Sequence, residues 1–241
     1  MSLEGRVILL TGASGGIGAA VASALVASGA RVGLFARSAG ALEVLASNLG
    51  DTALSLPGDV TQPDDLDRAV RTVLGRWGRL DALVYAAGIA RYAPLGTLGL
   101  ADWRATLDTN LTGAFLALTA CRAALVASGR GLALLVGSLA SEYPYPESAA
   151  YAASKAGLTA FGQAAALDLR PQGVRVCTLL PGSVATPITD PDEPDGWKLQ
   201  PADVAQVVVN LLELGPGVLP GRIELRPAQM PPQRRRGLTY Q

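Results

Sequence analysis

The stretch SEYPYPESAAYAASKAG, residues 141–157, carries three tyrosines and one of the two lysines in the chain. Prolines follow Tyr143 and Tyr145, and a proline biases the residue before it away from helical backbone. The alanine-rich sequence beyond them predicts a helix. On that helix Tyr151 and Lys155 lie four positions apart and share a face, so Tyr151 is the tyrosine that this lysine can assist.

This pair of side chains has a chemical use in proton transfer. A free tyrosine has a pKa near 10, too high for ready proton exchange at neutral pH. A nearby ammonium group favours the phenolate, and lowering the pKa to about 7 requires roughly 4 kcal/mol. Tyr151 could then give a proton to a carbonyl that is being reduced, or take one from an alcohol that is being oxidised.

The sequence VILLTGASGGIGAAVASAL, residues 7–25, has the order strand, glycine-rich turn, helix. Glycines let the backbone approach a ligand closely, and the free N–H groups at the start of the helix favour an anion such as a pyrophosphate. We therefore expect this turn to bind a dinucleotide. The residues expected to contact it are Gly12, Ser14, Gly15, Gly16, Ile17 and Gly18.

The same turn also fits a different motif. Residues 12–16, GASGG, match the nucleophile elbow of α/β-hydrolases, with Ser14 as the nucleophile. That chemistry needs a histidine to activate the serine. The chain contains no histidine, so we reject the hydrolase interpretation.

The end of the second predicted strand indicates which cofactor is bound. In dinucleotide folds an acidic side chain here binds the ribose 2′-hydroxyl, whereas a basic one accommodates a 2′-phosphate. The chain has Ala36 where the acid is expected, followed by Arg37 and Ser38. A guanidinium and a hydroxyl suit a phosphate, so we expect NADP(H) to be preferred, with NAD(H) as the alternative.

The elements that must position these residues alternate along the chain. Strands are predicted at 7–10, 32–36, 53–56, 82–86, 132–137, 174–180 and 222–225, and helices at 17–28, 40–49, 63–76, 102–128 (continuous or broken), 149–169 and 201–214. Continuous apolar strands suit a parallel sheet covered on both faces. The predicted fold is α/β: a single-domain, Rossmann-type, doubly wound sheet of seven mainly parallel strands with helices on both faces. We expect a catalytic domain over 1–228 and a tail over 229–241.

Composition narrows the functional class. Of 241 residues, 20 are basic and 20 acidic, so we expect no nucleic-acid partner. Apolar runs are broken before membrane-spanning length, and the N-terminus lacks a signal-peptide pattern, so we expect no membrane. Cys121 and Cys177 are expected to be buried free thiols in a reducing compartment, which favours the cytoplasm. Without histidine, we expect no metal site.

Two predicted helices, over 111–128 and 149–169, are apolar nearly all round. A helix that covers a sheet needs one apolar stripe only, so we expect a homo-oligomer, a dimer or tetramer, to cover the remaining surface. The alternative is an exposed surface of small alanine side chains.

Together these segments resemble a known family, the classical short-chain dehydrogenases/reductases. The similarity runs in order from the first strand to about residue 187 and more loosely to 226. It is carried by TGASGGIG (11–18), GDV (58–60), AAG (86–88), DTNLTGAF (108–115), VGSLAS (136–141), YAASK (151–155) and PGSVATP (181–187). The resemblance implies an oxidoreductase that transfers a hydride between NADP(H) and a small carbonyl or alcohol substrate, of ketone, aldehyde or 3-oxoacyl type.

The resemblance also implies roles for individual residues. Tyr151 would be the catalytic acid/base, and Lys155 would hold the ribose and lower the tyrosine pKa. Ser138 would bind the substrate oxygen, and Asn110 would support a water-linked proton relay to Lys155. Further cofactor contacts would come from Asp59 and Val60 at the adenine, Ala86, Ala87 and Gly88 along the floor, and Pro181, Gly182, Val184 and Thr186 at the nicotinamide.

One position departs from the family pattern. Two asparagines usually precede the final AG, whereas this chain has Tyr85 and Ala86. The usual side-chain bonds of this strand cannot form, which puts its local geometry in question. A non-catalytic NADP-binding sensor or scaffold on the same fold is therefore the alternative function.

The expected substrate pocket follows from the same alignment of segments. Its walls would be Ile89, Arg91, Tyr92, Leu139, Ser141, Tyr143, Tyr145 and Ser183, covered by a short segment after Pro187. We expect Arg91 and Glu142 to be surface charges, and the arginines at 234–236 to lie in a solvated tail.

Overall fold

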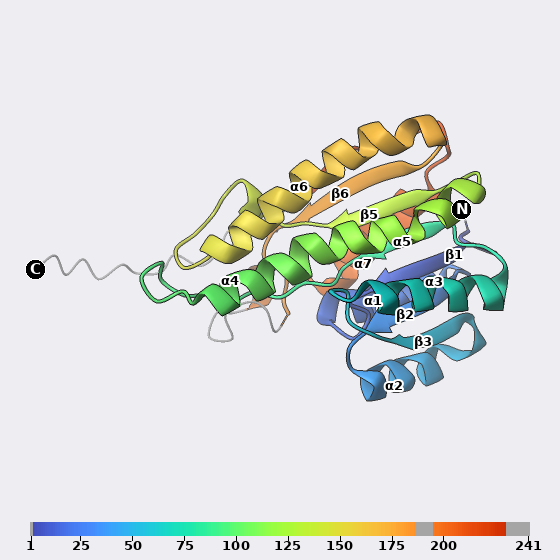
Figure 1. The fold of residues 1–241 in the computed structure, drawn as a ribbon, viewed down its shortest axis with the longest axis horizontal. Coiled ribbons are helices and arrows are strands. Elements are labelled where there is room, and N and C mark those ends of the chain that lie inside the picture. The colour runs from blue at the N-terminus through green and yellow to red at the C-terminus, as the bar shows by residue number, and fades with distance from the viewer. Residues whose placement is uncertain (1, 187–194, 230–241) are drawn as a thin grey trace, which may run out of the picture.

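The computed structural model describes residues 2–186 and 195–229, and shows one sheet with helices on both faces (Figure 1). The strands are β1 (Val7–Thr11), β2 (Arg31–Ala36), β3 (Ala53–Pro57), β4 (Ala82–Tyr85), β5 (Leu132–Val136), β6 (Arg175–Pro181) and β7 (Arg222–Leu225). Their order is β3-β2-β1-β4-β5-β6-β7, and every neighbouring pair is parallel. The predicted fold class is confirmed, with a sheet that is wholly parallel within the described residues.

The helices form a layer on each face of this sheet. They are α1 (Gly16–Ala27), α2 (Ala39–Leu49), α3 (Pro63–Trp77), α4 (Leu100–Leu107), α5 (Gly113–Ala127), α6 (Ala149–Leu169) and α7 (Pro201–Glu213). One buried core joins α1, α2 and α7 to the sheet, and the other joins α3, α5 and α6. Figure 1 shows α3, α5 and α6 lying across the same side of the strands.

The strands form where the sequence is continuously apolar. Every residue of β1, β4, β5 and β6 is buried, as expected for parallel strands covered on both faces. The predicted strands are confirmed, and their ends shift by one residue. Thr11, which extends β1, stays buried because its Oγ1 accepts a hydrogen bond from the Ala87 N–H at 3.3 Å.

The long helix predicted over 102–128 is broken. A π-helical turn, Asp108–Thr112, separates α4 from α5. The whole stretch Leu100–Ala127 is long and apolar enough to cross a membrane by length and composition, yet 44% of its most apolar window is buried inside the fold. Because α5 contacts α3, β4 and β5, it has the placement of a core helix.

The two cysteines are buried free thiols, as predicted, and burial raises the pKa of Cys121 and of Cys177 to about 12. Other predictions concern 187–194 and 230–241, which lie outside the described residues. They include the pocket cover after Pro187 and the solvated arginines at 234–236.

The strand order places a crevice at the carboxyl end of β1. The chain winds outward from β1 to β3 in one direction, and from β4 to β7 in the other. In a doubly wound sheet, ligands bind beyond the carboxyl ends of the strands at such a reversal. The glycine turn follows β1 and residues 86–88 follow β4, so the fold brings both predicted cofactor segments to this place.

The opposite end of β4 is fixed by a buried carboxylate. Asp81 accepts hydrogen bonds from the guanidinium groups of Arg79 and Arg130, and from the backbone N–H of Val7 at 2.9 Å. Burial alone would raise the pKa of Asp81, but the bonds from Arg130, Arg79 and Val7 outweigh it and lower the pKa below its usual value. The carboxylate thus joins the amino ends of three neighbouring strands.

We expect Asp81→Asn to lower the free energy of unfolding by about 2 kcal/mol at pH 7, because charge-assisted bonds to a buried group are lost. Since the folded pKa lies below the unfolded value of about 3.9, the carboxylate stabilises the fold above that pH. This contribution disappears as the pH falls through the folded pKa. Urea denaturation at several pH values should show the two proteins converging below about pH 4, and a constant difference would contradict this assignment.

Candidate functional site

A cavity of about 390 Å³ opens at the carboxyl ends of β1 to β4. Its lining includes most of the predicted cofactor residues. They are Gly12, Ser14, Gly15, Gly16, Ile17, Gly18, Arg37, Ser38, Asp59, Val60, Ala86, Ala87, Gly88 and Thr186. Pro181, Gly182, Val184, Tyr151 and Lys155 are not among its lining residues. Ala36, Gly58, Ile89 and Thr109 line it without having been predicted as cofactor contacts.

The glycine turn is shaped by close backbone contacts. Gly12 has φ of +69°, and a Cβ there would lie 2.7 Å from the backbone of Ala86 and Ala87. A Cβ on Gly18 would lie 2.0 Å from the carbonyl oxygen of Gly12. These positions can hold only glycine. A Cβ on Gly15, by contrast, would lie 3.4 Å from the Gly12 carbonyl oxygen, and Gly15 precedes the first turn of α1, whose N–H groups favour an anion.

Polar and charged side chains at one part of this cavity could hold an anionic group of a bound dinucleotide. Arg37 and Ser38, at the end of β2 and start of α2, are exposed and line the cavity. The lining contains one carboxylate, that of Asp59, whose Oδ1 accepts bonds from the N–H and hydroxyl of Thr61 at 2.9 Å. The donor set near Arg37 is therefore suited to an anion.

Tyr151, Lys155 and Ser138 meet beside this cavity. Tyr151 is hydrogen-bonded to Ser138, which caps a short 3-10 turn after β5. The Lys155 Nζ lies 5.8 Å from the centroid of the Tyr151 ring and donates to the carbonyl oxygen of Val136 at 2.9 Å. A Cβ on Gly88, which lines the cavity, would lie 3.5 Å from this Nζ. The predicted spacing on one helix face thus places both groups at the cavity's edge.

Burial shifts the pKa of both groups of this pair. Burial raises the pKa of Tyr151 to about 12, although the hydrogen bond with Ser138 lowers it. Burial lowers the pKa of Lys155 to about 8. Desolvation of the phenolate is therefore the largest influence on the pKa of Tyr151 among the chain's own groups.

Asn110 is fully buried in the π-helical turn between α4 and α5. Its Oδ1 accepts a bond from the Ile89 N–H at 2.8 Å, and its Nδ2 donates to the Ile89 carbonyl oxygen and to Ser154 Oγ, both at 2.9 Å. Ser154 donates in turn to the carbonyl oxygen of Tyr151 at 2.7 Å. Asn110 therefore fixes the loop after β4 against α6, and its described partners do not include Lys155.

The position where the chain departs from the family pattern is not left without side-chain bonds. Tyr85 is fully buried, and its hydroxyl donates to the carbonyl oxygen of Thr109 in the π-helical turn. A different side-chain bond is therefore present at this position, because the longer side chain of Tyr85 reaches the neighbouring helix. Neither Tyr85 nor Ser154 was predicted as a site residue, since their partners lie far away in the sequence.

Aromatic side chains gather beside Tyr151. The ring of Tyr92 contacts those of Tyr151 and Tyr145, with centroids 6.0 and 5.8 Å apart, and the Tyr145 hydroxyl donates to that of Tyr92 at 2.8 Å. Tyr143 lies apart from this group, under the guanidinium of Arg226. Two of the three predicted wall tyrosines, Tyr92 and Tyr145, thus flank Tyr151.

The charged residues expected at the surface pair with other charges. Arg91 lies 3.8 Å from Asp102, and Glu142 forms an ion pair with Arg222. Both pairs consist of partly or largely exposed side chains.

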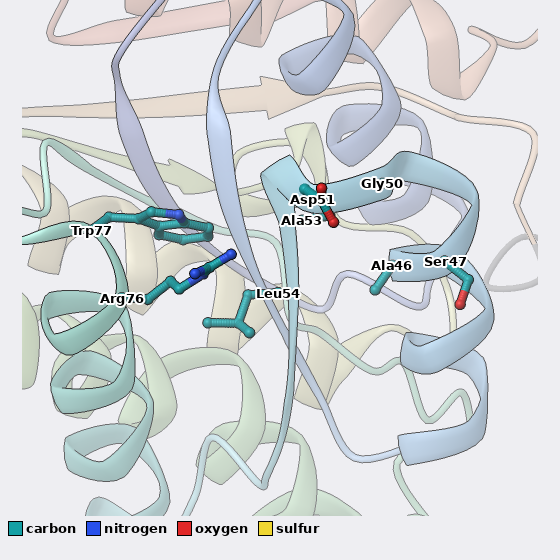
Figure 2. A pocket seen from close by; sticks show the side chains of 8 residues that line it. All are labelled: Ala46, Ser47, Gly50, Asp51, Ala53, Leu54, Arg76 and Trp77. Carbon is teal, nitrogen blue, oxygen red and sulfur yellow. The ribbon is translucent and has the colours of Figure 1, made fainter.

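A second cavity, of about 370 Å³, lies at the amino end of the edge strand β3 (Figure 2). Its ionisable side chains are Asp51 and Arg76, which come from opposite walls, with Trp77 beside Arg76. It contains none of the predicted site residues. Within residues 2–186 and 195–229, no group of three or more His, Cys, Asp or Glu side chains is arranged to hold a metal ion.

Comparison with known sequences agrees with this geometry. The family model of the short chain dehydrogenases matches residues 6–196. A 3-oxoacyl-(acyl-carrier-protein) reductase of Synechocystis sp. is 36% identical over 193 residues, which are 78% of this chain and 78% of that protein. D-threitol dehydrogenase of Mycolicibacterium smegmatis is 38% identical over 187 residues, 76% of this chain and 72% of that protein.

Solved structures share the whole fold. An alcohol dehydrogenase of Thermococcus sibiricus, complexed with 5-hydroxy-NADP, superposes with a TM-score of 0.87 at 30% identity, covering 95% of this chain and 99% of the other. A 3-ketoacyl-(acyl-carrier-protein) reductase of Brucella melitensis, complexed with NADH, gives 0.87 at 27% identity, covering 94% and 99%. The chain therefore belongs to the short-chain dehydrogenase family, and is an oxidoreductase of the kind that acts on carbonyl or alcohol groups.

Proposed function

We propose that this protein is an NADP(H)-dependent reductase of small carbonyl compounds, also able to oxidise the corresponding alcohols, with Tyr151 as the general acid/base. The observation that carries the proposal is the Tyr151 side chain, hydrogen-bonded to Ser138 and accompanied by a buried Lys155, at the edge of a glycine-lined cavity. A sensor would have no need of such a proton donor.

The residues lining this cavity would hold a nicotinamide dinucleotide, which would supply or accept the hydride. Ser138 holds the substrate oxygen, and Tyr151 gives this oxygen its proton during reduction. Lys155, charged below about pH 8, stabilises the phenolate that remains. Asn110 keeps the loop at Ile89 and the helix at Ser154 in their relative positions. Arg37 and Ser38 bind the 2′-phosphate, and the N-terminus of α1 binds the pyrophosphate.

Removal of the proton donor tests the mechanism. Tyr151→Phe should lower kcat for carbonyl reduction by about 10³-fold, within the range of general acid–base catalysis. NADPH binding, measured by fluorescence titration, should change little because the ring remains. Full activity in this variant would refute the assignment, whereas NADPH binding by the wild type without turnover of any carbonyl would favour the sensor.

The pH dependence of reduction should follow Lys155. With its pKa raised to about 12, Tyr151 keeps its proton across the working range. Lys155 loses its charge as the pH rises through about 8. When carbonyl reduction is measured at several pH values, kcat/KM of the wild type should therefore be constant below this pH and fall above it.

The cofactor preference is tested at Arg37. Arg37→Asp should raise the KM for NADPH by about 100-fold, since a charge-assisted contact becomes a repulsion, while the KM for NADH should stay the same or fall. Arg31→Ala, at the exposed amino end of the same strand, is the matched control and should leave both values unchanged. A wild type that strongly prefers NADH would contradict the preference.

The substrate is proposed by class. Relatives include a 3-oxoacyl-(acyl-carrier-protein) reductase and a D-threitol dehydrogenase, so the assay panel should contain 3-oxoacyl thioesters, simple ketones and polyols. We also propose that the protein acts in the cytoplasm.

We further propose that α5 and α6 form a homo-oligomer interface, in a dimer or tetramer. Phe115 of α5 is 51% exposed and contacts Phe161 of α6, and Leu167 is 73% exposed. Phe115→Glu should lower the molar mass measured by light scattering. Val44→Glu, on α2 with a similarly exposed side chain, should not. A monomeric wild type would refute the interface.

A further inference from the structure

Tyr85 occupies the last position of β4, between Thr11 of β1 and Leu135 of β5. Its ring is fully buried in the core shared with α3, α5 and α6, and its hydroxyl donates to the Thr109 carbonyl oxygen. Burial raises the pKa of this hydroxyl, so it remains a neutral donor at every working pH. A buried tyrosine hydroxyl needs a hydrogen-bond partner, and here the partner belongs to the turn that carries Asn110.

The Thr109 carbonyl is available because the helix widens at this point. In an α-helix the Gly113 N–H would donate to Thr109, four residues earlier. In the structure it donates to the carbonyl oxygen of Asp108, five residues earlier. The Tyr85 hydroxyl therefore takes the place of a helical donor and stabilises the π-helical turn, a form that often marks functional sites.

Gly113 provides the space for this hydroxyl. A Cβ at position 113 would lie 2.5 Å from the Tyr85 hydroxyl oxygen and 3.0 Å from Val60 Cγ2. The tyrosine ring is fully buried among packed side chains, so its hydroxyl cannot easily move aside. The Tyr85 side chain therefore fits only because position 113 has no side chain.

The turn held in this way positions Asn110. Asn110 follows Thr109 directly, and its side chain bonds the N–H and carbonyl of Ile89 and the hydroxyl of Ser154. Ile89 lines the cofactor cavity, and Ser154 precedes Lys155 on α6. A shift of the turn would therefore reach both the cavity and the helix that carries the acid/base pair.

We propose that Tyr85 is a positioning residue, whose hydroxyl holds the π-helical turn so that Asn110 can fix the Ile89 loop and α6 in their catalytic arrangement. The effect on catalysis rests on the proposed function of Tyr151 and Lys155. The effect on the position of Asn110 can be measured without it.

The experiment begins with Tyr85→Phe, which removes the hydroxyl alone. Hydrogen exchange of the Ile89 amide, followed by NMR in the protein without added ligands, should become about tenfold faster, because the bond to Asn110 opens more often. The kcat for the best substrate of the panel should fall about tenfold, as expected from one lost hydrogen bond. The KM for NADPH should change less than twofold, since the glycine turn is untouched.

A rescue pair separates the hydrogen bond from the filled space. In Tyr85→Phe/Gly113→Ser, a serine hydroxyl can donate to the carbonyl four residues earlier, which is Thr109. Tyr85→Phe/Gly113→Ala fills the same space without a donor. We expect the serine variant to recover kcat and slow Ile89 exchange, and the alanine variant to recover neither.

Asp81→Asn, at the other end of β4, is the control for an effect that arises from reduced stability alone. This variant should lose stability to a comparable extent while keeping wild-type kcat and slow Ile89 exchange. A drop in kcat as large as that of Tyr85→Phe would show that β4 stability, not the hydroxyl, is responsible. Unchanged exchange or unchanged kcat in Tyr85→Phe would also overturn the proposal.

The outcomes distinguish this proposal from the proposed function. If Tyr151→Phe is fully active while Tyr85→Phe speeds Ile89 exchange and lowers kcat, the acid/base assignment fails and the positioning role of Tyr85 stands. If Tyr151→Phe is inactive while Tyr85→Phe matches the wild type in kcat and exchange, the positioning role alone fails.

Discussion

The site depends on a positive charge that is kept out of water. Lys155 is buried beside the cavity, and its Nζ donates to a backbone carbonyl, that of Val136, instead of a carboxylate. An ammonium in such a place is costly, which is why its pKa falls to about 8. The small residues of α6 let this helix approach the sheet closely enough for the Lys155 Nζ to reach Val136, while the four-residue spacing on the helix keeps the ammonium beside Tyr151.

The two ends of β4 are fixed by different kinds of interaction, one charged and one neutral. At the amino end, Asp81 binds two guanidinium groups that remain partly exposed. At the carboxyl end, where charge would compete with the site, the neutral hydroxyl of Tyr85 performs the corresponding task. Just beyond this end, the Ala86–Ala87 backbone lies against Gly12 without room for a methyl group.

The sequence predicts those features that depend on local pattern. Continuous apolar runs determine β1 and β5, and the four-residue spacing of Tyr151 and Lys155 places both on one face of α6. The role of Asn110 is different, because its partners, Ile89 and Ser154, are 21 and 44 residues away. Such donors and acceptors are chosen by tertiary packing, and no periodicity signals them.

Tyr85 illustrates the same limit more sharply. Its departure from the family pattern is visible in the sequence, but the outcome depends on whether a hydroxyl reaches the next helix, and on the missing side chain at Gly113. To predict that Tyr85 replaces the usual bonds, one would have to consider it together with Gly113, 28 residues away, and to know that the helix before Gly113 contains a π-helical turn.

The electrostatics of the site favour one direction of proton transfer. Lowering the pKa of Tyr151 from about 12 to about 7 would need about 7 kcal/mol. The Lys155 Nζ lies 5.8 Å from the centroid of the Tyr151 ring, and two unit charges about 6 Å apart interact by roughly 3 kcal/mol at an effective dielectric constant of 20. The lysine alone therefore cannot make the resting tyrosine a base. It can, however, stabilise the phenolate once a proton has passed to a carbonyl oxygen, because that charge then forms next to a group already in place. The chain's own charges thus prepare Tyr151 to donate, and oxidation of an alcohol must draw on a further positive charge or on higher pH.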